Sequence, residues 1–334
     1  MASSSVLTFV DPHPYQAAIR AAQVEILVTT KGDFRAELTK IDLPRLWMQR
    51  GRESLPRISH SHIPAERAPI FFLAGANQPA IHHSGMDLSP GEIMVYGSGA
   101  THHHRTSAPC HWGSMSLTPR DLASAGRAIV GRDLAVPSVT YLVRPAALLV
   151  ARLLDLHEAA GQLAKSAPDL LARPQVARAL EQSLVRAMIM CLTEGTAVEM
   201  SAGGQHHAAV IARFEELLAA NHEQPLYLAE ICAATGVSER TLRVCCQQHL
   251  GMGPVHYLWL RRMHLARRAL RLADPAAATV TGIATEFGFW ELGRFAVEYR
   301  TLFGEPPSAS LRRPADDRRA SRDRPLSLAD SESA

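Results

Sequence analysis

The feature that most constrains the fold is a pattern of apolar residues and glycine that occurs twice near the C-terminus. In each copy, the residues before a glycine, Gly236 or Gly288, have the spacing i, i+3, i+4, i+7, which places them on one face of a helix. A glycine at the end of such a helix can adopt the left-handed backbone that a sharp turn requires. The pattern therefore predicts two short helices that each end in a tight turn. Its members are Leu228, Ile231, Cys232 and Thr235 in the first copy and Val280, Ile283, Ala284 and Phe287 in the second.

A second amphipathic pattern follows each turn and again stops at a glycine. Its apolar stripe has the spacing i, i+4, i+8, which also belongs to one helical face. Ser238 stands where the first of these helices needs an N-cap. One such pair of helices is common in ordinary helical hairpins, but two copies in the same phase favour two helix-turn-helix units. The stripes consist of Leu242, Cys246 and Leu250, and of Phe295, Tyr299 and Phe303.

The segment between the two units predicts one long connecting helix. It reads "PVHYLWLRRMHLARRALRLA", with Pro254 near its start and Asp274-Pro275 at its end. Residues 207–313, which contain both units, resemble the C-terminal DNA-binding domain of the AraC/XylS family of bacterial transcription regulators. The resemblance is carried by "ATGVSERTL", by this connector and by "GIATEFGFWELGRFAVEYRTLFGEPPSASLRR". It implies that each unit places its second helix in one of two consecutive major-groove segments of double-stranded DNA, about one helical turn or roughly 34 Å apart.

The candidate base-reading residues lie opposite the apolar stripes. Arginine reads guanine through two hydrogen bonds, so Arg240 and Arg243 are the main candidates in the first unit and Arg294 in the second. Val297 departs from the family pattern, which has a long polar residue there, and Gly293 has no side chain. The second unit is therefore expected to grip mainly the DNA backbone, with help from Arg300. The full set of expected DNA-binding residues is Ser238, Glu239, Arg240, Arg243, Gln247, Arg262, Trp290, Gly293, Arg294 and Arg300.

Residues 24–118 differ in character, since they contain short β-friendly runs separated by turn residues. Short strands that follow one another so closely predict a small barrel or jelly roll. The segment "LSPGEIMVYGSGATHHH" looks like the strand pair of the cupin-like sensor domains of the same regulators. A barrel of this kind encloses a cavity, so a small-molecule effector pocket is expected there.

The predicted class is thus α+β, with a jelly-roll sensor before an all-α domain with two helix-turn-helix units. Helical patterns at 145–164 and 174–194 suit dimerisation, or else cover the open end of the barrel. Residues 195–206 predict a glycine-rich linker. The expected divisions are 1–144 for the sensor, 145–206 for the helical dimerisation and linker region, 207–313 for the DNA-binding domain and 314–334 for a disordered tail.

Histidines in the N-terminal region raise the alternative of a metal site. "HSHIPAE" has an HxHxxxE spacing reminiscent of the metal-binding cupin motif, and two histidines of "THHHR" would share one face of a strand. Imidazoles and a carboxylate can hold a transition metal. Pro64 interrupts the motif, however, which favours pocket lining or a surface position. The alternative ligands are His60, His62, Glu66, His102 and His104.

Composition and the absence of other motifs limit the remaining classes of function. The five cysteines show no CxxC spacing, and no secretory leader or membrane-length apolar run is present. The sequence therefore predicts a cytoplasmic, nucleoid-associated protein without a membrane partner. No triad, phosphate-binding loop or dinucleotide motif occurs, so neither catalytic residues nor a cofactor are predicted.

The family resemblance implies a homodimer that acts with RNA polymerase, most often as an activator. The alternative is a metal-dependent cupin-type enzyme, or a metal sensor, fused to a DNA-binding domain.

Overall fold

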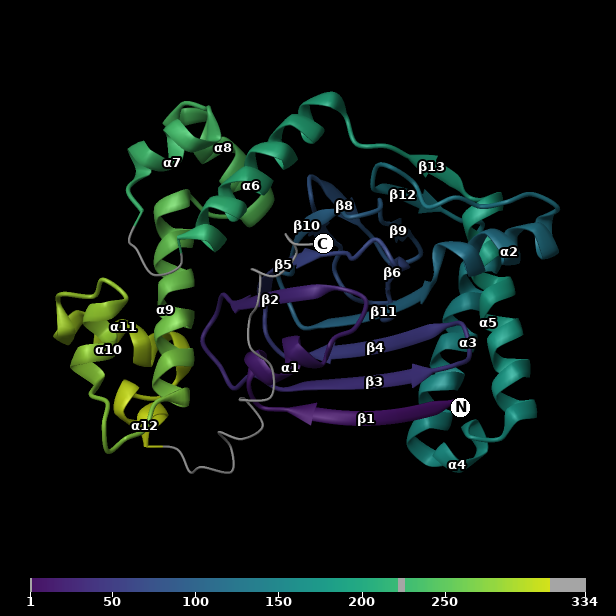
Figure 1. Cartoon of the computed structure of the whole chain (residues 1–334), viewed down its shortest axis with the longest axis horizontal. Coiled ribbons are helices and arrows are strands. Elements are labelled where there is room, and N and C mark those ends of the chain that lie inside the picture. Colours follow the sequence, from purple (N-terminus) through teal and green to yellow (C-terminus); the bar gives the residue numbers. More distant parts are fainter. Residues whose placement is uncertain (1, 222–225, 313–334) are drawn as a thin grey trace, which may run out of the picture.

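The computed structural model describes residues 2–221 and 226–312, so the predicted tail at 314–334 lies outside the described residues. Two antiparallel sheets form the N-terminal half of the molecule (Figure 1). The larger sheet has the order β1-β3-β4-β11-β6-β9-β12-β13, and the smaller has the order β2-β5-β10-β7-β8. The strands are β1 Ser3–Phe9, β2 Gln23–Val28, β3 Ala36–Asp42, β4 Trp47–Glu53, β5 Arg57–His62, β6 Ala68–Leu73, β7 Ile81–His83, β8 Met86–Leu88, β9 Ile93–Val95, β10 Thr101–Arg105, β11 Cys110–Leu117, β12 Tyr141–Arg144 and β13 Thr196–Val198.

The two sheets enclose a core of their own, as the predicted β-rich sensor domain requires. Ile26, Phe71 and Trp112 belong to this core, which also receives Tyr15 from α1 (Pro12–Ala18). Because side chains alternate across a strand, the residues that alternate with these core residues along each strand point to the outer face of the sheet. The sandwich therefore offers two outer faces for other layers.

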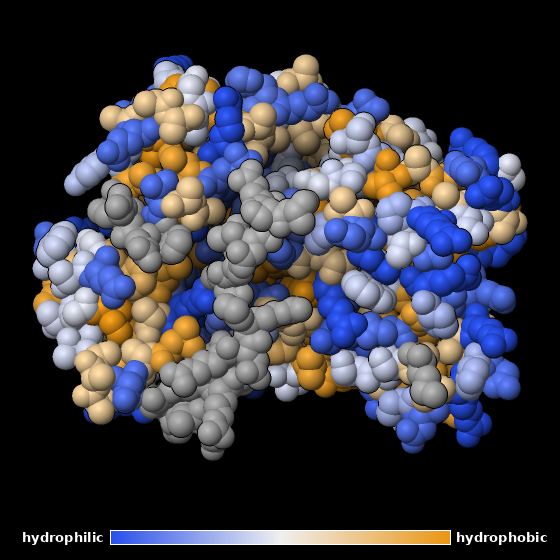
Figure 2. Space-filling model, in the orientation of Figure 1, coloured by the Kyte–Doolittle hydropathy of each residue, from blue (hydrophilic) through white to orange (hydrophobic). Residues whose placement is uncertain are grey.

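Two long helices cover the outer face of the larger sheet. α3 (Ala147–Ser166) and α5 (Pro174–Glu194) bury residues such as Leu153 and Leu184 in a second core against this sheet. The exposed side of this helical layer is predominantly hydrophilic (Figure 2). α2 (Pro119–Val130) and the short α4 (Pro168–Leu171) complete this layer.

The expected linker at 195–206 is wrong in detail. Residues 196–198 form β13, which pairs with β12 and so adds an edge strand to the larger sheet. The following helix, α6, begins at Ala202, with the Ser201 hydroxyl accepting a hydrogen bond from the Gly204 amide at 3.1 Å. Glycines at 203 and 204 are thus tolerated in a first helical turn, where a capped N-terminus compensates for their low helix propensity.

The C-terminal domain is helical throughout its described part and matches the predicted pattern. α7 and α8 form the first helix-turn-helix unit, α10 and α11 form the second, and α9 joins them as one straight helix (Figure 1). Both predicted apolar stripes, on α8 and α11, are buried in a single core with residues from α6 and α9. The helices are α6 Ala202–Ala220, α7 Leu228–Thr235, α8 Glu239–Leu250, α9 Pro254–Leu272, α10 Val280–Glu286, α11 Leu292–Phe303 and α12 Pro307–Leu311.

The helical domain packs on the outer face of the smaller sheet. Leu27 of β2 and Ile58 of β5 point outward and join the core of the helical domain. The molecule is therefore layered, with α3 and α5 at one end, the two sheets between, and the helical domain at the other end (Figure 1).

Candidate nucleic-acid interface

The turns of both helix-turn-helix units have the backbone that their glycines predict. Gly236 and Gly288 have φ of 70° and 77°, in the left-handed region where other residues are strained. Ser238 caps α8, since its hydroxyl accepts a hydrogen bond from the Thr241 amide at 3.2 Å. Gly251 and Gly304, which end the two second helices, have φ of 73° and 76°. Two glycines thus set the local geometry of each unit, and the Ser238 cap adds to that of the first.

Nearly all predicted DNA-binding side chains are free of the protein core. Trp290 is 77% exposed, and Arg262 is the only member of the set that is partly buried. Arg262 lies against the turn of the second unit, with its guanidinium 5.4 Å from the centre of the Phe289 ring. The exposed members are Ser238, Glu239, Arg240, Arg243, Gln247, Trp290, Gly293, Arg294 and Arg300.

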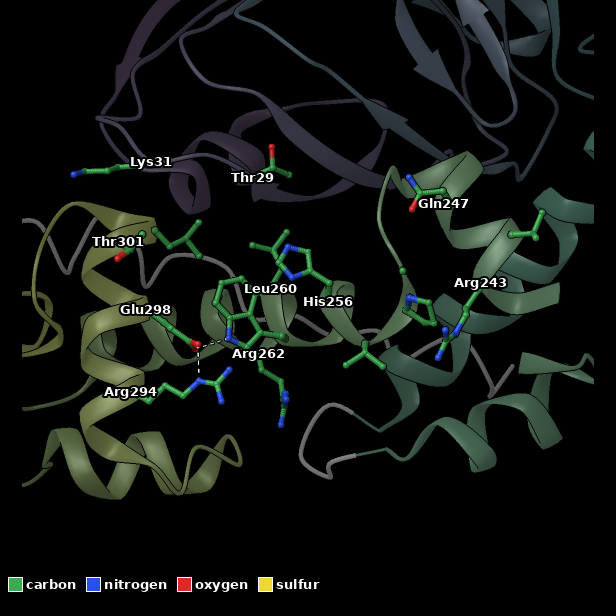
Figure 3. A pocket seen from close by; sticks show the side chains of 16 residues that line it. Thr29, Lys31, Arg243, Gln247, His256, Leu260, Arg262, Arg294, Glu298 and Thr301 are labelled. Carbon is green, nitrogen blue, oxygen red and sulfur yellow. Dashed lines mark hydrogen bonds and ion pairs between the residues drawn. The ribbon is translucent and has the colours of Figure 1, made fainter. Parts of the chain in front are cut away.

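A groove of about 1080 Å³ lies between the two second helices (Figure 3). Arg243 and Gln247 approach it from α8, Arg294 approaches it from α11, and Arg262 lies between them on α9. The remaining predicted residues do not line it. Basic side chains outnumber acidic ones in its lining, with Lys31, Arg243, Arg262 and Arg294 against one carboxylate, Glu298. A groove with this charge balance favours an anionic partner.

Ion pairs within each helix hold two of these arginines. Arg243 contacts Glu239 at 2.5 Å, and Arg294 contacts Glu298 at 2.8 Å. Exposed pairs of this kind contribute only about 0–1 kcal/mol, so either arginine can exchange its carboxylate for a phosphate or a base at low cost. Glu298 also accepts a hydrogen bond from Trp259 of α9 at 2.9 Å. Sequence reasoning missed Trp259, although its spacing i, i+3 from Arg262 places it on the same helical face.

Three of the five connector arginines serve the contact with the N-terminal domain. Arg271 forms an ion pair with Asp11, Arg267 lies 3.4 Å from the same carboxylate, and Arg261 lies 3.7 Å from Glu25. His264 donates a hydrogen bond to the Val28 carbonyl at 3.0 Å. The arginine-rich face of α9 is therefore directed mainly toward acidic residues of the N-terminal domain, in β2 and at the start of α1.

The Asp11 contact gives a first prediction. Asp11 is 4% exposed, so Asp11→Asn removes a buried charge from two arginines while the amide oxygen can still accept from the His13 amide, now bonded at 2.8 Å. We expect a loss of about 1.5–3 kcal/mol in the free energy of unfolding and faster amide exchange in α1 and α9. Asp42→Asn is the matched control, because the Arg20–Asp42 pair is partly exposed and joins no domains. Equal losses in the two variants would contradict the role of Asp11.

The N-terminal histidines form two clusters on opposite faces of the smaller sheet. His102 and His104 share one face of β10 as predicted, and they meet His83 of β7 between the sheets. His60 instead lies opposite His103 in the strand register and stacks on it, with ring centres 4.6 Å apart, on the outer face.

The five residues of the alternative metal set therefore do not form a single site in the structure. His60 points away from His102 and His104 because the register pairs it with His103. His62 is exposed on β5 beside Thr101, and Glu66 is exposed in the turn that follows the strand. The sets that the structure brings together are His83, His102 and His104, and His60, His103 and Glu215.

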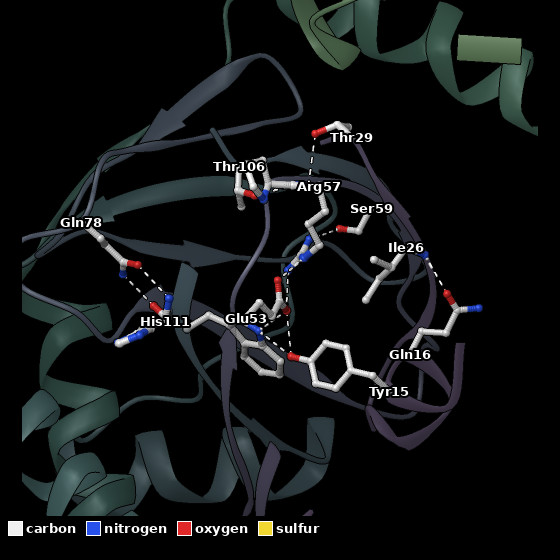
Figure 4. Close-up of polar contacts among 12 residues, drawn as sticks. Tyr15, Gln16, Ile26, Thr29, Glu53, Arg57, Ser59, Gln78, Thr106 and His111 are labelled. Atoms are coloured by element: carbon white, nitrogen blue, oxygen red, sulfur yellow. Dashed lines mark hydrogen bonds and ion pairs between the residues drawn. The ribbon is translucent and has the colours of Figure 1, made fainter. Parts of the chain in front are cut away.

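A buried polar network occupies the space between the sheets near His104 (Figure 4). Glu53 accepts hydrogen bonds from Tyr15 at 2.7 Å and from Trp112 at 2.8 Å, and it forms an ion pair with Arg57. Burial alone would lower the pKa of Arg57, but the Glu53 carboxylate raises it above its ordinary value. A cavity of about 50 Å³ adjoins Arg57, His102 and Trp112. That volume suits one or two waters or an ion, and is below the several hundred Å³ of typical organic-ligand pockets.

Comparisons with known proteins bear on the C-terminal domain. A family model described as a helix-turn-helix domain matches residues 231–313. The "Probable thc operon regulatory protein" of Rhodococcus erythropolis is 45% identical over 97 residues, which are 29% of each chain. The "XylDLEGF operon transcriptional activator 3" of Pseudomonas putida is 36% identical over 103 residues, or 30% of each chain. The chain thus spans about three tenths of the length of these relatives.

Among solved structures, the AraC-like transcriptional activator CuxR aligns with 79% of this chain and 94% of its own, at 14% sequence identity and a TM-score of 0.41. No helix in the described ranges is long and apolar enough to cross a membrane.

Proposed function

Because the C-terminal part of the chain is an AraC-type helix-turn-helix domain, we propose that the whole protein is a sequence-specific transcription regulator. The observation that carries the proposal is the groove between α8 and α11, to which both helices contribute exposed basic side chains. In this proposal the two helices enter consecutive major-groove segments on one face of the DNA. Arg240, Arg243 and Gln247 read bases in the first segment, while Trp290, Arg294 and Arg300 grip the second.

The proposed mode of regulation is activation in response to an effector. Matched relatives that are named as operon transcriptional activators support activation, and thus a contact with RNA polymerase. The sandwich is the proposed sensor, but its 50 Å³ cavity must widen to hold an organic effector.

A homodimer through α3 and α5 is also proposed. Sedimentation velocity tests it, and a monomer at micromolar concentration would contradict it. We assign the protein no catalytic residue and no cofactor.

Genome-wide mapping of bound DNA tests the central proposal. We expect discrete binding sites that share a motif with two elements about one helical turn apart, next to promoters. Uniform binding without a shared motif would refute sequence-specific recognition.

Arg300 gives a separate prediction about the DNA backbone. Arg300→Ala should weaken binding to the mapped site and to unrelated DNA by similar factors, because a phosphate contact carries no sequence information. The slope of log K against log salt should become shallower by about 0.9, the value for one lost phosphate contact. Titrations at four salt concentrations measure both effects. A change in sequence preference without a change in slope would show that Arg300 reads a base.

The buried His83, His102 and His104 cluster favours a second candidate, a metal-dependent cupin-type enzyme or metal sensor fused to the DNA-binding domain. Elemental analysis of the wild type and of His83→Gln, both purified without chelators or a histidine tag, tests this candidate. This candidate requires stoichiometric metal that the His83→Gln variant loses.

A further inference from the structure

Three ionisable side chains converge where the helical domain meets the smaller sheet. His60 comes from β5, His103 from β10 and Glu215 from α6, so the group spans both domains. One ring nitrogen of each histidine and one carboxylate oxygen all lie within 4.8 Å of one another. His103 Nε2 lies 3.3 Å from Glu215 Oε1.

Apart from the contact between His103 Nε2 and Glu215 Oε1, the facing atoms of this group have no polar partner of good hydrogen-bond geometry among the described residues. His60 Nε2, His103 Nε2 and Glu215 Oε1 are all buried, and none has a hydrogen-bond partner of acceptable geometry among the described residues. Glu215 itself is 1% exposed and His103 is 3% exposed. Buried polar groups are nearly always satisfied by protein, water or an ion. Three buried polar atoms within 4.8 Å of one another, joined only by the His103–Glu215 contact, are therefore a candidate site for a ligand.

The donor atoms of the group suit a cation. Burial lowers the pKa of His60 to about 4, so this imidazole is neutral at pH 7 and has a free lone pair. Burial by itself would raise the pKa of Glu215, but the neighbouring His103, His60 and Arg261 lower it to about 2, so the carboxylate is charged. Two imidazoles and one carboxylate form a donor set that Zn²⁺ and Fe²⁺ adopt in proteins, whereas Mg²⁺ and Ca²⁺ prefer oxygen ligands.

We propose that His60, His103 and Glu215 bind a divalent transition-metal ion of the Zn²⁺ class, which joins the sensor sheet to the DNA-binding domain. Metal–ligand bonds of about 2.0–2.1 Å at tetrahedral angles place the donor atoms about 3.4 Å apart. His103 and Glu215 already have about this separation, whereas His60, which stacks on His103, must approach and turn its ring toward the ion. A water or an effector group completes the coordination. Tyr257 and Arg261 of α9 adjoin the Glu215 carboxylate and orient it as outer-shell partners.

Charge separates this site from the other histidine cluster. His83, His102 and His104 offer three imidazoles, with Arg57 nearby and no carboxylate in the set. A buried dication there would need its anionic ligand from solution, such as a hydroxide. At the interface, Glu215 supplies the negative charge.

An ion at the interface would hold the two domains together, which we call its mechanical role. Because the ligands come from β5, β10 and α6, the complete set exists only while the helical domain is docked on the sheet. Metal binding therefore favours the docked arrangement by mass action. Binding of the ion does not depend on the proposed function, whereas its effect on transcription rests on it.

Zn²⁺ and Co²⁺ titrations of the full chain test the site. The protein is purified without a histidine tag, stripped with a chelator and titrated by calorimetry, with visible absorption as a second readout for Co²⁺. We expect one ion per chain, and affinity reduced by more than about 100-fold in Glu215→Gln and His60→Gln, since even outer-shell partners are worth about 10- to 100-fold. His62→Gln, on the same strand but exposed, and His83→Gln, in the other cluster, are the matched controls and should bind as wild type does.

Amide exchange supplies a readout of the mechanical role. Zn²⁺ should slow exchange in α6 and β10 of the wild type and leave Glu215→Gln unchanged, provided that circular dichroism shows both proteins folded. Should wild type bind no stoichiometric metal, or should His83→Gln alone abolish binding, the proposal is overturned. DNA affinity is measured separately on metal-free protein. Failure to bind DNA would then refute the proposed function and leave the metal result intact.

Discussion

Arg240→Ala and Arg243→Ala are each expected to weaken binding to the cognate DNA site by about 1–3 kcal/mol, the discrimination carried by one bidentate arginine–guanine contact. Both side chains are exposed on α8, and Arg243 lines the groove between the second helices. Binding to unrelated DNA should change much less, because that affinity comes from phosphate contacts. Fluorescence anisotropy with the mapped site and with a scrambled duplex measures both quantities.

Arg120→Ala provides the control for this experiment. Arg120 is exposed on α2, at the end of the molecule opposite the helix-turn-helix units, so its loss should leave both affinities unchanged. If the α8 variants bind the mapped site as tightly as this control, then α8 does not read bases.

Arg57→Leu is expected to lower the free energy of unfolding by about 3–5 kcal/mol, because it leaves the Glu53 carboxylate buried without its counter-ion. Glu53 is 0% exposed and Arg57 is 2% exposed, so water cannot replace the lost partner. Urea unfolding of the wild type and of the variant, followed by tryptophan fluorescence and by circular dichroism, measures the difference.

Two further variants test whether the loss of stability comes from the broken ion pair. Arg52→Leu changes an exposed arginine on β4 and should alter stability by no more than about 0.5 kcal/mol. Glu53→Gln combined with Arg57→Leu removes both charges and should recover part of the loss. A double variant less stable than Arg57→Leu alone would show that Glu53 stabilises the fold through Tyr15 and Trp112 rather than through its ion pair.

The helix-turn-helix units were predictable because their signals are local. A glycine with positive φ, a serine cap and an apolar stripe all act within a few residues, so their spacing in the sequence determines the geometry. Gly236 and Ser238 illustrate this, since the structure gives each the backbone conformation or hydrogen bond expected of it. Which exposed residues of these units contact DNA stays a prediction.

The histidine clusters could not be predicted in the same way. Whether His60 meets His102 or His103 depends on the register between β5 and β10, and a shift of one residue exchanges the two faces of a strand. Glu215 lies more than 100 positions from His103 and joins it only through domain docking. Likewise, the sequence of α9 alone suggests a DNA-binding surface. Only the structure shows that some of its arginines face Asp11 and Glu25 instead.

The outward position of Leu27 and Ile58 has a consequence for how the chain melts. Both side chains complete the helical domain's core from strands of the sensor, so neither half retains a sealed apolar interior after separation. Calorimetry should accordingly record one heat-absorption peak instead of two. A fragment that ends before α6 should also self-associate through the uncovered strands, whereas the intact chain should not.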